Sequence, residues 1–196
     1  KIKNIKFFGM VKKKACIFIS GNGSNLNNLI KKSRDYNFPI KVELVICNNS
    51  KAIGRIFAKK NSIPYFLINT NKRDFENKII SILKIYKIEI ICLAGYMKII
   101  SKNFINRFRK KIINIHPSLL PKYKGLNTYS RIIKNKEKKA GCSVHLVNEK
   151  LDNGTIIVQK SFYLQTSENE LSLKRKTQRL EYLAYPEAIY KIYKNR

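Results

Sequence analysis

Short apolar runs alternate with segments of helical periodicity through the first half of the chain, and this order constrains the fold most strongly. The apolar runs lie at residues 14–20, 42–47, 65–68 and 90–94. The helical segments lie between them, at residues 26–36, 52–61 and 72–87. The run at 90–94 shows no polar alternation, which is typical of a strand covered on both faces. Because strands and helices alternate, we predict an α/β fold: a mostly parallel twisted sheet with helices on both faces.

The second half of the chain predicts a different local arrangement. Residues 140–147 alternate in polarity, and residues 155–162 look like a hairpin partner that follows Asn153 and Gly154, a pair that favours two-residue turns. We therefore expect an antiparallel hairpin near residues 140–163, after a short helix at 128–134. Ser167 and Glu170 have the spacing of a capping box at the start of another helix. We expect Pro186 to interrupt that helix and to begin a final one.

Residues 21–25, Gly-Asn-Gly-Ser-Asn, connect the first predicted strand to the first predicted helix. Such a turn presents backbone N–H groups and the positive end of the helix dipole to an anion. Position 26 is Leu, so the GxGxxG dinucleotide motif is incomplete, and GxxxxGK[ST] is absent. We interpret the loop as a phosphate-binding loop; the alternative is a tight turn with Ser24 as helix cap.

Asn114 and His116 follow an apolar run and stand two residues apart. In an extended backbone their side chains point to the same side, and the prolines that follow stiffen the exit from the strand. The carboxyl ends of parallel strands meet at one edge of a sheet, where ligands bind. The loops at residues 21–25 and 95–98 also follow strands, so a site at this edge is expected. The alternative is a strand end before a Pro-rich turn, with His116 as an ordinary hydrogen-bonded side chain.

Asp152 is one of three aspartates in a chain with only two histidines. A carboxylate orients a catalytic histidine by accepting a hydrogen bond from its imidazole. Here the carboxylate would stand at the hairpin end and the imidazole at a strand end. The alternative for Asp152 is a plain turn residue. Gln178 and Glu181 share a helix face and are expected to be solvated unless that face meets the site.

The overall composition limits the possible classes of protein. The 196 residues, 44% of them hydrophobic, suit one globular α/β domain. No segment is long and apolar enough to span a bilayer, and the amino-terminal segment lacks the pattern of a signal peptide. The cysteines show no CxxC pair or metal-ligand spacing; they are Cys16, Cys47, Cys92 and Cys142. We therefore expect a cytoplasmic protein with reduced cysteines, no metal and no membrane partner.

The net charge of +29 raises the possibility of nucleic-acid binding. However, the lysines are scattered rather than clustered, and the chain is also rich in Ile and Asn, which A/T-rich codons encode. We attribute most of the charge to genome composition and expect no specific nucleic-acid partner. The resulting field would still steer small anionic substrates toward the protein.

Several motifs together resemble the phosphoribosylglycinamide formyltransferase family, the folate-dependent enzymes of purine biosynthesis. They are ISGNGSNL (19–26), LAGYMKIIS (93–101), NIHPSLLPKYKGL (114–126), SVHLV (143–147), LDNG (151–154), and Gln178, Glu181, Tyr185 and Pro186. The resemblance covers nearly everything from residue 14 onward. It implies a Rossmann-like formyltransferase domain at 14–196, a basic tail at 1–13 without a family counterpart, and a monomer or homodimer.

The resemblance also implies a reaction and a set of site residues. The formyl group of 10-formyltetrahydrofolate, a co-substrate, would pass to the amino group of glycinamide ribonucleotide through a tetrahedral intermediate. The catalytic residues would be Asn114, His116 and Asp152. Asn114 and protonated His116 would stabilise the oxyanion, and Asp152 would raise the pKa of the histidine. Glycinamide ribonucleotide would bind Gly23, Ser24, Asn25, Gln178 and Glu181. The folate would bind Arg73, Met97, Lys98, Ile99, Ile100 and Asn114. For His145 we expect a structural or supporting role.

Two other formyl-folate enzymes share the Asn-His block. A methionyl-tRNA formyltransferase would need a further carboxyl-terminal tRNA-binding domain, for which we expect no room because this chain ends at Arg196. A formyltetrahydrofolate hydrolase would carry an amino-terminal regulatory domain. A basic nucleic-acid-binding module is the remaining alternative, and it predicts aromatic residues within a clustered basic face. The sequence shows no such cluster.

Overall fold

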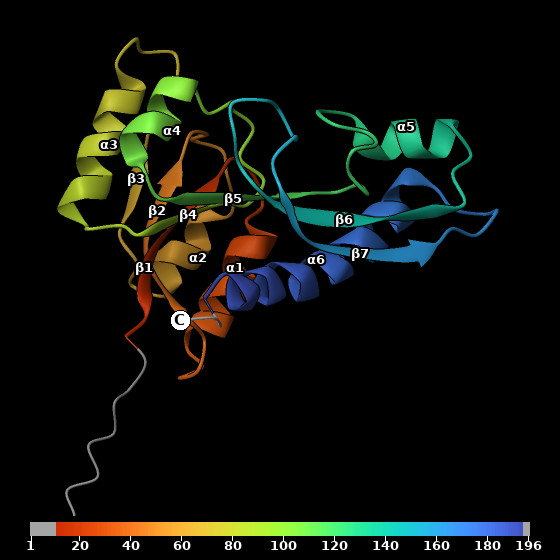
Figure 1. Ribbon diagram of the computed structural model, residues 1–196, viewed down its shortest axis with the longest axis horizontal. Helices are drawn as coiled ribbons and strands as arrows, with labels where there is room; N and C mark the ends of the chain where they lie inside the picture. Colours follow the sequence, from red (N-terminus) through yellow and green to blue (C-terminus); the bar gives the residue numbers. More distant parts are fainter. Residues whose placement is uncertain (1–10, 194–196) are drawn as a thin grey trace, which may run out of the picture.

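A computed structural model describes residues 11–193 (Figure 1). The strands in this part of the chain are β1 (Lys13–Ile19), β2 (Ile40–Cys47), β3 (Tyr65–Leu67), β4 (Ile90–Leu93), β5 (Lys111–His116), β6 (Lys139–Leu146) and β7 (Ile156–Tyr163). The helices are α1 (Ser24–Ser33), α2 (Arg55–Lys60), α3 (Phe75–Ile85), α4 (Lys102–Phe108), α5 (Thr128–Lys134) and α6 (Glu170–Tyr193). The predicted basic tail at 1–13 lies outside the described residues up to residue 10, and β1 begins at Lys13.

The strands form one seven-stranded sheet in the order β3-β2-β1-β4-β5-β6-β7. The first five strands pair in parallel, whereas β6 runs antiparallel to both β5 and β7. The predicted fold class and the hairpin near residues 140–163 are therefore confirmed. In Figure 1 the hairpin extends away from the parallel half, which makes the molecule long.

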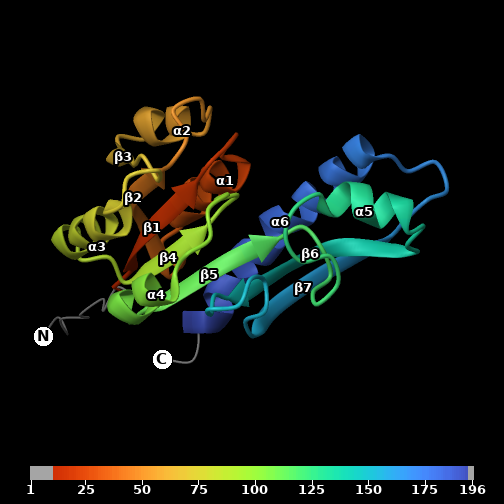
Figure 2. The same ribbon diagram turned by 90° about the horizontal axis from the view of Figure 1, so that it is seen from above.

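Helices cover both faces of the parallel half. Side chains of β1 alternate between two cores, with Ile17 in one and Phe18 in the other. The core that contains Ile17 is closed by α1 and α6, and the core that contains Phe18 is closed by α3 and α4 (Figure 2). Since both faces of β1 and β4 are buried, these strands read as continuous apolar runs in the sequence.

The connection between β6 and β7 differs from the prediction. It is not a two-residue turn at Asn153 and Gly154, because β6 ends at Leu146 and β7 begins at Ile156. Gly154 instead packs directly on the end of β6, where a Cβ would lie 1.6 Å from the carbonyl oxygen of Leu146. The loop of residues 147–155 therefore projects from the sheet and carries Asp152.

The prediction that Pro186 interrupts the last helix was wrong, because α6 continues through it. A proline leaves the carbonyl four residues earlier without its helical partner. That carbonyl belongs to Tyr182, and it accepts a hydrogen bond of 2.9 Å from Asn28 Nδ2 of α1 instead. The proline gap is thus used to join two helices.

Two local features of the helices were also predicted incorrectly or not at all. The capping contacts of α6 are reciprocal between Asn169 and Ser172, rather than between Ser167 and Glu170. The short helix α4 was not predicted, although Ser101 caps it by accepting a hydrogen bond from the N–H of Phe104. Its run of alternating polar and aromatic residues is too short to show a clear period.

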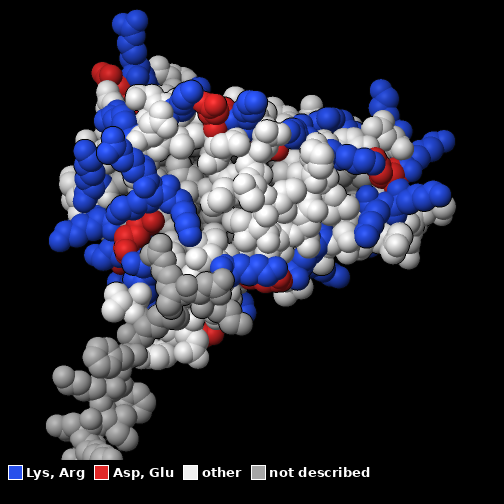
Figure 3. Space-filling model, in the orientation of Figure 1, with Lys and Arg blue, Asp and Glu red and all other residues white. Residues whose placement is uncertain are grey.

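The basic side chains are distributed as the sequence predicts. Figure 3 shows Lys and Arg mainly toward both ends of the visible face, while the centre, over β5 and β6 of Figure 1, is largely free of them. Acidic side chains are interspersed among them. None of the helices within residues 11–193 is long and apolar enough to cross a membrane.

Candidate active site

The carboxyl ends of β1 and β4 lie together, as expected for neighbouring parallel strands. The N–H of Ser20 donates to the carbonyl oxygen of Gly95 at 3.1 Å, and the N–H of Met97 donates to Ser20 Oγ at 2.8 Å. Ser20 immediately precedes the glycine loop, so its hydrogen bonds tie that loop to the segment that was predicted to contact folate. Asn114 and His116 follow on the next strand, β5.

The structure brings the three predicted catalytic residues together around one carboxylate. Asp152 Oδ1 lies 3.3 Å from Asn114 Nδ2, and Asp152 Oδ2 lies 3.3 Å from His116 Nδ1. The N–H of Gly125 donates to the same Oδ2 at 2.9 Å. Asp152 and His116 are both buried. A carboxylate from the hairpin loop therefore meets both side chains at the end of β5.

His145 is a fourth member of this cluster, and its position comes from the sheet register. It lies opposite Asn114 in the antiparallel β5–β6 pair. Its Nε2 is 3.3 Å from Asn114 Nδ2 and 3.6 Å from Asp152 Oδ1, while its Nδ1 faces the carbonyl of Leu146 at 2.9 Å. A buried histidine within an alternating strand was the only sequence signal available for this contact.

The cluster determines which groups are charged. Burial acts to raise the pKa of Asp152, but its bonds with His145 and the Gly125 N–H, together with the His116 charge, lower that pKa to about 2. Burial lowers the pKa of His116, and although the Tyr123 carbonyl and Asp152 act in the opposite direction, they do not outweigh it. Asp152 acts to raise this pKa, as predicted, but burial of the ring outweighs it.

Both ring nitrogens of His116 face hydrogen-bond acceptors. Nε2 lies 2.8 Å from the carbonyl oxygen of Tyr123, and because a carbonyl oxygen only accepts, this contact is a hydrogen bond when Nε2 carries a proton. Nδ1 faces Asp152, which is ionised and also only accepts. With a proton on each nitrogen, Nε2 can donate to the Tyr123 carbonyl while Nδ1 donates to Asp152. The hydrogen-bonding partners of the ring therefore suit the imidazolium form.

The glycine loop forms the start of α1. Gly23 occupies the N-cap position in the left-handed region, with φ 71°, and no side chain caps the helix. A Cβ on Gly23 would lie 2.6 Å from the Cα of Gly54, so two glycine backbones pack directly against each other here. Ser24 does not cap the helix: its Oγ accepts a hydrogen bond from Gln178 Nε2 at 2.7 Å. The first N–H groups of α1 thus have no side-chain cap to compete with an anion.

Glu181 lies in the same region, so the face of Gln178 and Glu181, which we expected to be solvated unless it met the site, contacts the glycine loop. Glu181 is buried, and its Oε2 accepts a hydrogen bond from Asn25 Nδ2 at 2.8 Å. Burial raises the pKa of Glu181 to about 7, against the opposing effects of Asn25 and Lys174. The buried Oδ1 of Asn25 has no hydrogen-bond partner among residues 11–193 and is available to a donor from a substrate.

The predicted folate-contacting residues occupy different surroundings. Met97, Lys98 and Ile99 are exposed on the loop after β4, whereas Ile100 is buried in the core that α3 and α4 close. Arg73 is exposed on the loop before α3, and no hydrogen bond or ion pair found among residues 11–193 joins it to the other site residues.

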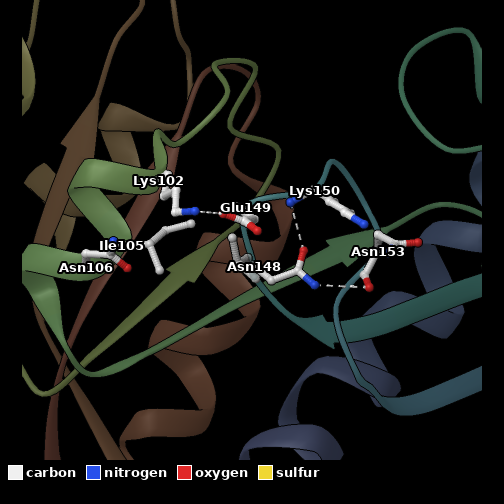
Figure 4. A pocket seen from close by; sticks show the side chains of 8 residues that line it. Lys102, Ile105, Asn106, Asn148, Glu149, Lys150 and Asn153 are labelled. Carbon is white, nitrogen blue, oxygen red and sulfur yellow. Dashed lines mark hydrogen bonds and ion pairs between the residues drawn. The ribbon is translucent and has the colours of Figure 1, made fainter.

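A cavity of about 410 Å³ lies between α4 and the loop that carries Asp152 (Figure 4). It is lined by Lys102, Ile105, Asn106, Val147, Asn148, Glu149, Lys150 and Asn153. Figure 4 shows an ion pair across it, between Lys102 Nζ and Glu149 Oε2 at 2.7 Å. Lys150 and Asn153 of its lining belong to the same loop as Asp152. This cavity could not be predicted from the sequence because its α4 wall was not predicted.

The described residues contain no group of three His, Cys, Asp or Glu side chains arranged to hold a metal ion. The cysteines are buried free thiols: Cys16, Cys47, Cys92 and Cys142.

Comparison with known proteins places these features in context. Residues 13–189 match the family model described as formyl transferase. The chain is 39% identical over 178 residues to phosphoribosylglycinamide formyltransferase of Haemophilus influenzae, covering 89% of this chain and 84% of that protein. It is 34% identical to the Bacillus subtilis enzyme of the same name, covering 90% and 93%. A solved structure of the Anaplasma phagocytophilum enzyme superimposes with a TM-score of 0.88 and 35% identity, covering 93% and 87%.

Proposed function

Because this chain belongs to the formyl transferase family, we propose that it transfers the formyl group of 10-formyltetrahydrofolate to the amino group of glycinamide ribonucleotide. It is a formyl-transferring enzyme of purine biosynthesis. We assign the activity to a domain at residues 14–196. We assign its chemistry from one observation: the ionised carboxylate of Asp152 contacts both Asn114 and His116.

Glycinamide ribonucleotide is proposed to bind along α1 and α6. Its phosphate would lie at the uncapped start of α1, on Gly23, Ser24 and Asn25, where N–H groups and the helix dipole favour an anion. Gln178 and Glu181 reach this loop from α6 through Ser24 and Asn25. Carboxylate oxygens accept hydrogen bonds, so Glu181 suits the ribose hydroxyls.

The ring system of the folate is proposed to occupy the cavity between α4 and the loop of residues 147–155. Ile105 and Val147 supply apolar wall, and asparagine and backbone groups supply polar partners. The exposed segment at residues 97–99 would contact the more distal part of the folate, and Lys98 and Arg73 are candidates for its carboxylates. This position places the formyl carbon toward Asp152 and Asn114.

In the proposed mechanism the substrate amine attacks the formyl carbon, which forms a C–N bond and leaves a negative charge on the formyl oxygen. Asn114 Nδ2 is placed to donate to that oxygen, since its present contacts of 3.3 Å with Asp152 and His145 are long for hydrogen bonds. His116 in its imidazolium form would add positive charge beside the oxygen.

The proton balance assigns work to Asp152 and His116. As the tetrahedral intermediate collapses, the bond from carbon to N10 of the folate breaks, the attacking nitrogen loses a proton, and N10 gains one. Asp152 remains ionised because its pKa is about 2, so it holds the imidazolium rather than storing the proton. His116 would relay the proton, directly or through water.

An absorbance assay for loss of the formyl group from 10-formyltetrahydrofolate, with and without glycinamide ribonucleotide, tests the reaction. Turnover that requires the ribonucleotide is the expected result. Turnover without it would instead identify a hydrolase, and turnover only with methionyl-tRNA would identify that formyltransferase.

A further inference from the structure

Tyr123 adopts an unusual backbone conformation next to the catalytic cluster. Its φ is 58°, in the left-handed region that bulky side chains rarely occupy. In this conformation its carbonyl oxygen lies 2.8 Å from His116 Nε2. Backbone of this kind persists only where the surroundings hold it in place, and it is concentrated at functional sites.

The surroundings of Tyr123 do hold it. Its hydroxyl donates to Glu137 Oε1 at 2.7 Å and accepts from Asn135 Nδ2 at 2.9 Å. The guanidinium of Arg131 lies over its ring, 5.3 Å from the centroid. The preceding carbonyl, that of Lys122, accepts a hydrogen bond of 2.6 Å from Ser118 Oγ. The loop is therefore fixed on both sides of the residue.

This carbonyl determines how the His116 ring is used. Because a carbonyl oxygen only accepts, its contact of 2.8 Å favours a proton on Nε2, and Nδ1 then lies 3.3 Å from Asp152. Three charged or titratable groups face the ring: Asp152 from the hairpin loop, His145 from β6 and Arg131 from α5. Asp152 favours the imidazolium, while His145 and Arg131 disfavour it. The Tyr123 carbonyl is an uncharged group that adds to the side of Asp152.

We propose that Tyr123 is a positioning residue for His116, and that it acts through its left-handed backbone, which presents a carbonyl to Nε2, rather than through its aromatic ring. The proposal rests on the proposed catalytic role of His116. It predicts that the tautomer and the pKa of His116 depend on whether residue 123 tolerates the left-handed backbone conformation, and not on the size of its side chain.

The test compares Tyr123→Asn with Tyr123→Val. The two side chains are similar in size, and both lose the ring and the hydroxyl contacts. Asn visits the left-handed region readily, whereas the β-branched Val does not. Each variant would be examined for thermal unfolding, for kcat and KM, and by ¹⁵N NMR of its histidines. With only two histidines in the chain, the signal lost in His116→Asn assigns His116.

In the parent and in Tyr123→Asn we expect Nε2 to stay protonated through the titration, with kcat within about twofold of each other. In Tyr123→Val we expect the neutral ring to lose its fixed tautomer, the pKa of His116 to fall further, and kcat to drop about tenfold. The pKa falls because the lost carbonyl favoured the imidazolium.

Equal loss of the tautomer in both variants would overturn the proposal in favour of a role for the ring. An unchanged His116 in Tyr123→Val would overturn it as well, because the carbonyl would then not hold the histidine. A changed tautomer with unchanged kcat would support the positioning role and contradict the proposed catalytic role of His116.

Discussion

At the scale of single residues, the site is built from polar groups in uncommon backbone conformations. Two of the residues with positive φ contact His116: Tyr123 and Asp152. The left-handed turn at Asp152 points its carboxylate back toward β5, where it accepts hydrogen bonds from Asn114 and the N–H of Gly125 and pairs with His116. The surrounding contacts offset the conformational free-energy cost of this backbone strain, and strain of this kind is typical of preorganised functional sites.

Replacing Asp152 by Asn tests the proposed role of the carboxylate. Asn keeps the shape and one acceptor oxygen but carries no charge to stabilise the imidazolium, so we expect kcat to fall on the order of 10²–10³-fold while the protein still folds. Steady-state kinetics and thermal unfolding measure the two effects. Asp35→Asn, at an exposed aspartate between α1 and β2, is the matched control. Near-normal turnover of Asp152→Asn would remove this residue from the mechanism.

At the scale of elements, α6 organises the ribonucleotide side of the site. One stripe of this helix contacts the glycine loop through Gln178 and Glu181, and α1 through the Tyr182 carbonyl. Further along the stripe, the fully buried Tyr185 donates its hydroxyl to the carbonyl oxygen of Leu93, at 2.8 Å, at the end of β4. Substrate loops and strand ends are thus held in register by a single rigid helix.

Glu181 makes the stability of α6 depend on pH. Its pKa is raised from 4.5 to about 7, so the folded state binds a proton that the unfolded state releases. Its contribution to stability is therefore full below pH 4.5 and is lost as the pH rises through 7. We expect Glu181→Gln to be more stable than the parent by about 3 kcal/mol above pH 7 and equal to it below pH 4.5.

Chemical denaturation at both pH values measures this difference. The same variant should raise the KM for glycinamide ribonucleotide, because a neutral amide accepts fewer hydrogen bonds than a carboxylate. If the two proteins are equally stable above pH 7, burying the charged carboxylate of Glu181 costs no unfolding free energy, and the prediction is contradicted.

The gap at Pro186 gives a second prediction for α6. Removing Asn28 leaves the Tyr182 carbonyl without its partner, so Asn28→Ala should cost about 1–2 kcal/mol of unfolding free energy. In a Pro186→Ala background the new N–H at position 186 can bond to that carbonyl. We therefore expect a smaller cost there, and a double-mutant cycle by denaturant unfolding measures the difference. Equal costs in both backgrounds would contradict the proposed use of the proline gap.

At the scale of the whole molecule, a strongly basic protein carries an ordinary α/β core. The sequence has a net charge of +29. On the face that Figure 3 shows, the Lys and Arg side chains lie around the edges and do not form one stripe. A distributed field of this kind attracts anions over a distance, and it is screened by salt because it involves exposed groups. We therefore keep the prediction that the protein has no specific nucleic-acid partner.

Binding to a random-sequence RNA should therefore be non-specific and steeply dependent on salt. We expect fluorescence anisotropy to show binding at low ionic strength and its loss near about 0.15 M salt. Under the same change kcat should stay constant, since the reacting groups are buried and little screened. Tight binding of RNA that persists in salt would contradict this account and point to a nucleic-acid function.

The sequence alone was sufficient for the order of strands and helices in the parallel half, because burial on both faces of a strand leaves a local pattern of apolar residues. The placement of Asn114 and His116 on one side of β5 is also local, since it follows from the two-residue period of a strand. The helix α4 also depends on neighbouring residues, but it is too short for its helical period to be recognised in the sequence.

Other features depend on groups far apart in the chain, and only the tertiary structure decided them. The pairing of Asn114 with His145 follows from the β5–β6 register, and the reach of Asp152 follows from how the loop of residues 147–155 folds back. Pro186 stays within its helix because Asn28 of α1 is placed to satisfy Tyr182. Tyr123 reaches His116 by its backbone carbonyl, which every residue type possesses. The sequence thus determines which groups are available, whereas long-range packing determines which of them meet, because hydrogen bonds and pKa shifts depend on distances that local patterns do not encode.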